Sequence, residues 1–173
     1  MQTRLRDEVQ SVIGDRPIQY EDINKLSFTR AVIDETMRLF PPAPVLARQC
    51  RETTEVCGRQ IEPGDIVILA TYVMHRKEQY WDDPLAFDPD RFIRKPELRA
   101  KGAAFMPFGG GPRICVGAAF ALMEALMVLA SLMRDYKIVV APDCYPRPKM
   151  TVTLRPEGGI KARLERVSRL ISL

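Results

Sequence analysis

The chain has 173 residues, 46% hydrophobic and 28% charged, which is the composition of a globular protein and excludes extensive disorder. Its net charge of +4 is spread along the chain rather than gathered in blocks, which argues against nucleic-acid binding. The N-terminal segment MQTRLRDEVQ lacks the apolar core of a secretory signal, so we expect a cytoplasmic chain, while a membrane anchor ahead of Met1 in a complete protein stays open.

Two helices are predicted at the N-terminal end of the chain. Apolar residues recur at helical spacing up to Gly14, which predicts an amphipathic helix over about residues 3–13. A second helix is predicted over about residues 28–40, with Ser27 as its N-cap. Two prolines follow directly, and a helix does not continue through them.

The second helix carries a carboxylate on its apolar face. At about 100° per residue, Glu35 projects between apolar side chains, and Arg38 follows at the edge of the same face. Burying a carboxylate costs several kcal/mol, which one intrahelical pair rarely offsets, so a buried pair needs a third group. Arg91, in the later coil, is the candidate. The alternative is an exposed Glu35–Arg38 pair worth a few tenths of a kcal/mol.

The middle of the chain changes to short β-prone runs and then to coil. The runs, separated by Gly and Pro-Gly, predict a small antiparallel sheet over about residues 45–73. The proline-rich stretch that follows has no sustained period, so we predict long ordered coil over about residues 80–115. We expect this coil to be held by its aromatic residues Trp81, Phe87 and Phe92.

A third helix, apolar on nearly every side, is predicted over about residues 116–134. Its length is at the lower edge of a membrane span, but the internal Glu124 and the glycine loop before it favour a helix buried in a protein core. Three β-prone runs after it, beginning with YKIVVA, predict strands. The predicted fold class is mainly α with small antiparallel β-sheets.

The cysteine and histidine content excludes several kinds of site. The four cysteines are too few and too widely spaced for a disulfide framework, and no Cys-x-x-Cys pair exists. His75 is the only histidine, so the sequence has no cysteine-histidine zinc pattern and no Ser-His-Asp triad without that residue. We interpret His75 as a structural hydrogen-bonding residue rather than a ligand.

The segment FGGGPRICVG, residues 108–117, is the most informative part of the sequence. It matches neither G-x-x-x-x-G-K-[ST] nor G-x-G-x-x-G, which argues against a phosphate-binding loop. Cys115 lies before a long predicted helix, whose unpaired N–H groups and dipole favour a thiolate. The glycines let the backbone approach a flat ligand, and Arg113 supplies a cation for a carboxylate. A heme would use both groups, the thiolate for its iron and the arginine for a carboxylate. The alternative is a redox or nucleophilic thiol without heme.

Three segments together resemble the cytochrome P-450 superfamily. FGGGPRICVG matches the F-G-x-G-x-R-x-C-x-G heme loop at every specified position, and ETMR, from Glu35 to Arg38, matches E-x-x-R. FDPDRF, residues 87–92, resembles F-x-P-E-R-F with Asp90 in place of the usual glutamate. The resemblance implies the C-terminal heme-binding part of the cytochrome P-450 fold, as a single partial domain over residues 1–173.

The resemblance also implies roles for individual residues. Cys115 is the expected axial iron ligand of heme b (iron protoporphyrin IX), and Arg113 and Arg48 are the expected propionate contacts. Glu35, Arg38 and Arg91 resemble the triad that locks the coil supporting the heme loop. The other expected heme contacts lie in the same loop: Phe108, Gly109, Gly111 and Gly117.

The implied function is that of a heme-thiolate monooxygenase, which uses O2 and two electrons to insert oxygen into a small, apolar organic substrate. An acidic ferredoxin, flavodoxin or reductase would supply the electrons, docked with the help of four basic residues: Arg94, Lys95, Arg99 and Lys101. The sequence lacks the family's oxygen-activating A/G-G-x-D/E-T-T element, and no catalytic residue is assigned to this chain. The alternative is a truncated, non-enzymatic or inactive heme-binding fragment.

Overall fold

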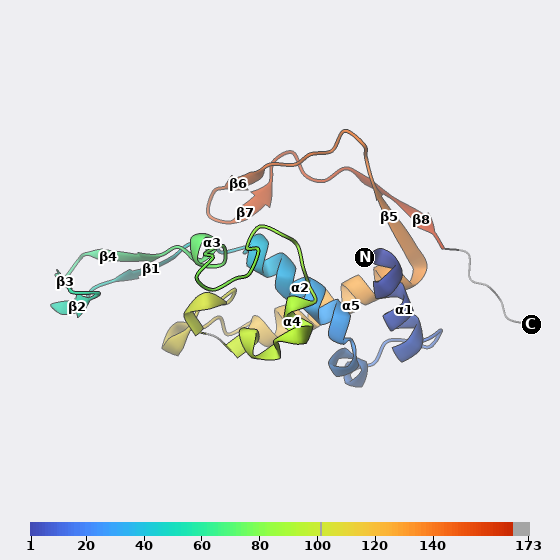
Figure 1. Cartoon of the computed structure of the whole chain (residues 1–173), viewed down its shortest axis with the longest axis horizontal. Coiled ribbons are helices and arrows are strands. Elements are labelled where there is room, and N and C mark those ends of the chain that lie inside the picture. Colours follow the sequence, from blue (N-terminus) through green and yellow to red (C-terminus); the bar gives the residue numbers. More distant parts are fainter. Residues whose placement is uncertain (101, 168–173) are drawn as a thin grey trace, which may run out of the picture.

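Three long helices form the body of the protein in the computed structural model, which describes residues 1–100 and 102–167 (Figure 1). These helices are α1 (Gln2–Val12), α2 (Ser27–Leu39) and α5 (Ala118–Asp135). Both α1 and α2 pack against α5, and they also contact each other. The bounds lie one or two residues from those predicted, because periodicity and the double proline are local signals.

Short helices of one or two turns occupy much of the connecting chain. The predicted coil is therefore a series of turns rather than extended backbone, and its hydrogen bonds are largely local. These short helices are η1 (Tyr20–Lys25), α3 (Thr71–Met74), α4 (Arg91–Arg94), η2 (Pro96–Ala100), η3 (Gly102–Ala104) and η4 (Gly111–Arg113).

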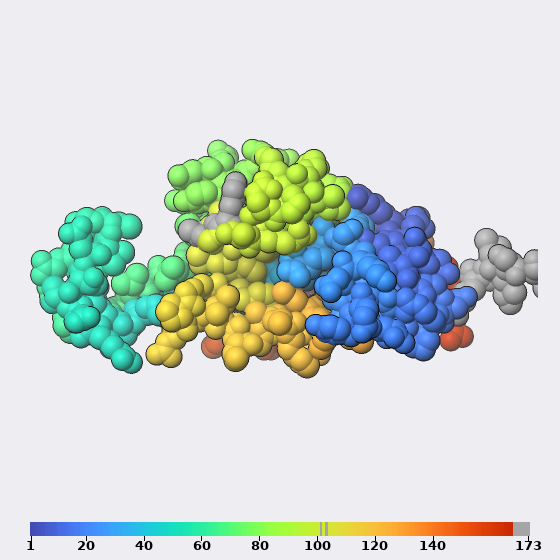
Figure 2. Space-filling model, turned by 90° about the horizontal axis from the view of Figure 1, so that it is seen from below, coloured from blue at the N-terminus to red at the C-terminus, as the bar shows by residue number. Residues whose placement is uncertain are grey.

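The strands within residues 1–100 and 102–167 form four separate two-stranded antiparallel ladders, β1–β4, β2–β3, β5–β8 and β6–β7. The first two make up an arm that extends away from the helices, in place of the single predicted sheet (Figures 1 and 2). Helices with small antiparallel sheets confirm the predicted class. The strands are β1 (Leu46–Gln49), β2 (Thr54–Val56), β3 (Arg59–Ile61), β4 (Ile66–Leu69), β5 (Tyr136–Val140), β6 (Pro148–Met150), β7 (Leu154–Pro156) and β8 (Ala162–Arg166).

The largest core cluster lies between the three long helices and consists of Val9, Ile13, Leu26, Ile33, Leu126 and Ala130. A second cluster joins α2 to the coil through Ala31, Trp81, Phe92, Leu98 and Phe105. Trp81 and Phe92 therefore hold the coil as predicted. The same prediction is wrong for Phe87, which is 42% exposed.

The N-terminus of α2 is capped by a residue of another helix. The Glu8 carboxylate of α1 accepts hydrogen bonds from the N–H groups of Phe28 at 2.6 Å and Thr29 at 2.8 Å, and from the Thr29 hydroxyl at 2.7 Å. Ser27, the predicted cap, is the first residue of the helix and only donates its hydroxyl to Glu8. The prediction was wrong because a carboxylate of α1 lies close enough to satisfy the free N–H groups and carries the charge that a helix N-terminus favours.

The predicted burial of the apolar helix α5 is only partly correct. Leu126, Ala130 and Met133 are buried, but Phe120 is 64% and Val128 52% exposed. Only one side of α5 packs against α1 and α2, so an all-round apolar sequence leaves apolar side chains at the surface. Within the described part of the chain, no helix has the length and apolar character needed to cross a membrane.

Candidate functional site

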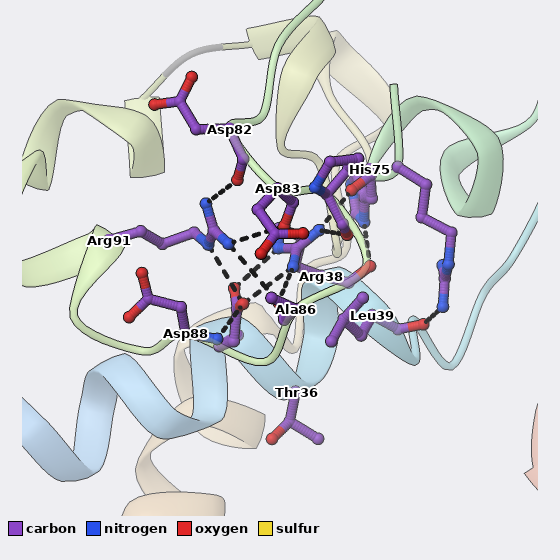
Figure 3. A network of polar contacts seen from close by, with 12 residues as sticks. Thr36, Arg38, Leu39, His75, Asp82, Asp83, Ala86, Asp88 and Arg91 are labelled. Carbon is purple, nitrogen blue, oxygen red and sulfur yellow. Dashed lines mark hydrogen bonds and ion pairs between the residues drawn. The ribbon is translucent and has the colours of Figure 1, made fainter. Parts of the chain in front are cut away.

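A buried network of charges joins α2 to the coil that precedes the Cys115 loop (residues 105–117) (Figure 3). Glu35 and Arg38 are both fully buried, and Arg91 is 6% exposed. The Glu35 carboxylate accepts hydrogen bonds from Arg38 Nε at 2.7 Å and Nη2 at 2.8 Å, and from Arg91 Nε at 3.1 Å. The structure thus brings the three residues together in the interior.

The two arginines use their remaining donors on backbone carbonyls of the coil. Arg38 donates to the carbonyls of His75 at 2.8 Å, Pro84 at 2.7 Å and Ala86 at 3.0 Å. Arg91 donates to that of Asp82 at 2.9 Å, and the N–H of Asp88 donates to Glu35 at 2.8 Å. Because this coil has no strand partner, these bonds replace a backbone ladder and fix its course.

A second buried carboxylate, Asp34, lies beside Glu35 on α2 and was missed in the sequence. Arg30 Nε donates to it at 3.0 Å from one turn earlier, and Arg99 Nε donates at 2.6 Å from η2. The Arg30–Asp34 pair could have been predicted from sequence, because residues four positions apart lie on the same side of a helix. The partner from η2 was not visible, since it lies far away in the sequence.

His75 connects α2 to the Cys115 loop. Its ring is fully buried, and Nδ1 lies 3.2 Å from the Arg38 carbonyl oxygen. On the other side of the ring, Nε2 accepts a hydrogen bond from the Met106 N–H, with 3.0 Å between the two nitrogens. Burial penalises the imidazolium and lowers the pKa of His75 from 6.5 to about 4, although two nearby carbonyls act in the opposite direction. His75 is therefore neutral at physiological pH.

The Cys115 loop is shaped by backbone hydrogen bonds and by glycines with positive φ. The Gly109 N–H donates to the Met106 carbonyl at 3.0 Å, and the Cys115 N–H donates to the Phe108 carbonyl at 2.9 Å. Gly109 has φ +78° and Gly111 φ +68°, which L side chains rarely adopt. A Cβ at Gly109 would also lie 3.4 Å from Leu46 Cδ1, so this glycine allows close contact with β1.

The start of α5 follows the cysteine closely. The helix begins at Ala118, and the Ala118 N–H donates to the Cys115 carbonyl at 3.2 Å. Cys115 is exposed, and a Cβ at Gly117 would lie 3.8 Å from its Sγ. The Cys115 loop and α5 lie side by side on one face of the molecule (Figure 2). The thiol is thus held in a fixed loop at a helix start and is open to a ligand.

A cavity of about 750 Å³ lies beside this thiol. Its volume falls in the range of about 300–1,000 Å³ that is typical of small-molecule and cofactor sites. It brings together Arg48, Phe108, Gly109, Arg113 and Cys115, and apolar residues of α2 and α5 form much of the rest of its wall: Val32, Ile33, Met37, Ala121, Leu122, Ala125 and Leu129. The apolar α5 face at this wall was not identified as a site in the sequence.

The donor set of the cavity fits a heme. One thiol is available for iron, apolar walls are available for a flat ring, and two arginines are available for carboxylates. Within residues 1–100 and 102–167, neither Arg48 nor Arg113 forms an ion pair with an acidic side chain. In the same part of the chain, no cluster of three or more His, Cys, Asp and Glu side chains is arranged for a metal ion.

Three of the four basic residues expected to dock an electron donor have acidic partners in the described part of the chain. Arg94 pairs with Asp88 at 2.6 Å and Lys95 with Asp82 at 3.2 Å. Arg99 is 28% exposed and turns inward to Asp34. Lys101 lies outside the described residues. Arg94 and Lys95 thus retain exposed side chains, whereas the charge of Arg99 belongs to the buried network.

Comparisons with known proteins identify the family of the chain. Residues 1–163 match the family model described as Cytochrome P450. The chain is similar to cyclooctatin synthase of Streptomyces melanosporofaciens, with 37% identity over 88% of this chain and 34% of that protein. It is also similar to putative cytochrome P450 132 of Mycobacterium tuberculosis, with 35% identity over 88% of this chain and 33% of that protein. Its similarity to human cytochrome P450 4F3 is 37% identity over 96% of this chain and 33% of that protein. The chain spans about a third of the length of these relatives.

Proposed function

Because the chain belongs to the cytochrome P450 family, we propose that it supplies the C-terminal, heme-binding part of a heme-thiolate monooxygenase. The single observation that carries this proposal is the cavity in which Cys115, Arg113 and Arg48 meet beside an apolar wall. A heme bound through a thiolate supplies the activation of O2 for oxygen insertion into an organic substrate.

In this proposal Cys115 is the axial iron ligand. Its position in a loop with two positive-φ glycines, three residues before the start of α5, supports this role because the loop backbone holds the exposed sulfur close to a helix N-terminus. Arg113 and Arg48 bind the propionates through their guanidinium groups. Phe108 packs beside the sulfur, and Gly109, Gly111 and Gly117 let the loop approach the ring.

Glu35, Arg38 and Arg91 act by fixing the coil that leads to the Cys115 loop. The hydrogen bonds that Arg38 and Arg91 donate to coil carbonyls, and the one that Glu35 accepts from the Asp88 N–H, support this role. None of the three touches the cavity beside Cys115. Their contribution is to hold the chain in place, so that the thiol and the propionate-binding arginines keep their spacing.

The proposed substrate is a small, apolar organic molecule, and the proposed electron donor is an acidic ferredoxin, flavodoxin or reductase. Arg94 and Lys95, with 59% and 55% of their side chains exposed, are candidates for this docking. Exposed charges of this kind affect association most at low ionic strength, so reduction of the protein by its donor should slow as salt rises. Reduction rates independent of salt would contradict this docking.

The spectrum of the reduced, CO-bound complete protein tests the function. A thiolate-type Soret band is expected in the wild type and is lost in Cys115→Ser. Cys57→Ser is the matched control, because Cys57 is also an exposed free cysteine but lies at the turn between β2 and β3. A band typical of histidine or thiol ligation in the wild type, or a thiolate band that survives in Cys115→Ser, contradicts the proposal.

The second candidate is a non-enzymatic or inactive heme-binding fragment. The exposed apolar side chains of α5, Phe120 and Val128 among them, favour this reading for the chain on its own, because such a face is normally covered in a stable soluble protein. Expression of residues 1–173 alone distinguishes the two candidates. Stable, monomeric, heme-loaded protein with turnover would contradict the fragment reading.

A further inference from the structure

His75 lies at the junction between α2 and the start of the Cys115 loop and makes hydrogen bonds to both. It lies directly after α3, and its fully buried ring touches both α2 and the segment that opens the Cys115 loop. On one side Nδ1 lies 3.2 Å from the Arg38 carbonyl, and on the other Nε2 lies 3.0 Å from the Met106 nitrogen. The same residue is also held through its backbone, since Arg38 Nη1 donates to its carbonyl at 2.8 Å.

These contacts permit only one protonation state of the ring. The Met106 N–H is a donor, so Nε2 must be the unprotonated acceptor. The Arg38 carbonyl is an acceptor, so Nδ1 must carry the proton. A doubly protonated ring would place an N–H against the Met106 N–H and would lose that bond. The connection to the loop therefore exists only while His75 is neutral.

The bond to Met106 continues directly into the Cys115 loop. The Met106 carbonyl accepts from Gly109 at 3.0 Å, and the Phe108 carbonyl accepts from Cys115 at 2.9 Å. The Phe105 ring packs on the imidazole with a centroid separation of 5.4 Å, which fixes the residue before Met106 as well. Hydrogen bonds and short backbone segments thus connect Arg38, through the imidazole of His75, to the backbone of Cys115.

We propose that His75 is a positioning residue of the heme-thiolate site, which couples the Glu35–Arg38–Arg91 network to the Cys115 loop through its neutral Nδ1–H tautomer. This inference rests on the proposed function. It assigns no contact between His75 and the heme. Protonation of the ring is expected to detach the loop start and to weaken the hold on Cys115.

The charges around His75 favour its neutral form. Arg38 of α2 and Arg76, the next residue in the chain, are the cations that face it, and both oppose a third positive charge. Glu35 is engaged by Arg38 and Arg91, and the Phe105–Met106 segment contributes no charged side chain. With burial as the larger cause, these cations hold the pKa of His75 near 4. The connection is therefore complete at neutral pH and opens on acidification.

The test compares the wild type with two variants of the complete, heme-loaded protein. In His75→Gln an amide oxygen reaches the position of Nε2 and accepts from Met106 but does not titrate near pH 4. In His75→Phe the ring volume and the packing on Phe105 are retained but both hydrogen bonds are lost. Thr71→Val is the matched control, because Thr71 is buried on α3 and its hydroxyl donates to the Ala43 carbonyl, away from the loop.

The first measurement is hydrogen exchange of the Met106 amide, which does not depend on the heme spectrum. Exchange is expected to accelerate about tenfold in His75→Phe, to stay near the wild-type rate in His75→Gln and to be unchanged in Thr71→Val. Equal exchange in the wild type and His75→Phe overturns the coupling. This measurement stays informative even where the wild type shows no thiolate-type band, a result that would sink the proposed function alone.

The second measurement is the pH dependence of the thiolate-type band. In the wild type the band is expected to decline as the pH falls toward 4, where the His75 ring takes up a proton. The decline in His75→Gln is expected at a lower pH, since that side chain stays neutral. Identical pH profiles in the two proteins overturn the proposal, and this comparison decides the question even where His75→Phe does not fold.

Discussion

Replacing Glu35 with glutamine tests the buried network most directly. The carboxylate accepts hydrogen bonds from Arg38 at 2.7 and 2.8 Å, from Arg91 at 3.1 Å and from the Asp88 N–H at 2.8 Å. A glutamine keeps the shape but has one acceptor oxygen, and its NH2 group faces guanidinium donors. Both arginines then remain buried without a counter-charge.

The expected loss in the free energy of unfolding is about 3–5 kcal/mol, which is the usual cost of removing one partner of a buried ion pair. Arg38 is fully buried and Arg91 is 6% exposed, so water cannot solvate either guanidinium without opening the coil. For a urea dependence of about 2 kcal/mol per molar, the unfolding midpoint falls by about 2 M. Urea unfolding followed by circular dichroism measures this shift.

Lys149→Ala is the control, because the Lys149–Glu157 pair is 59% and 55% exposed. An exposed pair contributes about 0–1 kcal/mol, so the control midpoint is expected to move little. If Glu35→Gln lowers the free energy of unfolding by no more than Lys149→Ala, water reaches the network and the interpretation of Glu35, Arg38 and Arg91 as the anchor of the coil is refuted.

Three further predictions use the same unfolding assay. Glu8→Gln is expected to lower the free energy of unfolding by about 1 kcal/mol and Ser27→Ala by less than about 0.5 kcal/mol; the reverse order would make Ser27 the cap. Because the pKa of His75 falls from 6.5 in the unfolded chain to about 4 on folding, the unfolded state binds the extra proton between these values. Stability is therefore full above pH 6.5 and drops by about 3 kcal/mol toward pH 4, and a pH series on His75→Gln should lack this drop. Gly111→Ala, at φ +68°, is expected to cost about 1–2 kcal/mol, whereas Gly110→Ala, at φ −157° with open space around it, is neutral; equal costs would refute the strain.

The parts of the fold that were predicted from sequence depend on local signals. The bounds of α2 follow from the spacing of its apolar residues and from the double proline after Leu39, both within one segment. Glu35 was recognisable because a carboxylate on an apolar face needs partners wherever the face packs. Arg91 was a natural partner because it lies in coil that has no backbone ladder of its own.

The features that were missed are bonds between segments far apart in the chain. The Glu8 cap joins α1 to α2, and Arg99 of η2 reaches Asp34 across 65 positions. The bond from the Met106 N–H to His75 spans 31 positions and is made by a backbone group, which leaves no trace in the side-chain pattern. Such pairings depend on how elements pack, and packing is not specified by the periodicity of either element alone.

The same distinction separates the Cys115 loop from the cavity beside it. The loop could be predicted because its shape depends on its own residues, with positive φ at Gly109 and Gly111 and a cysteine three residues before the start of α5. The cavity is instead the space that remains between α2, β1, α5 and the loop itself, so no single segment encodes it. The apolar sequence of α5 predicts that its surface is covered, but it does not identify the segment or ligand that covers it. The exposed Phe120 belongs to the part of that face which α1 and α2 leave uncovered. A site made by one segment can therefore be predicted from sequence, whereas a site made where several segments pack together cannot.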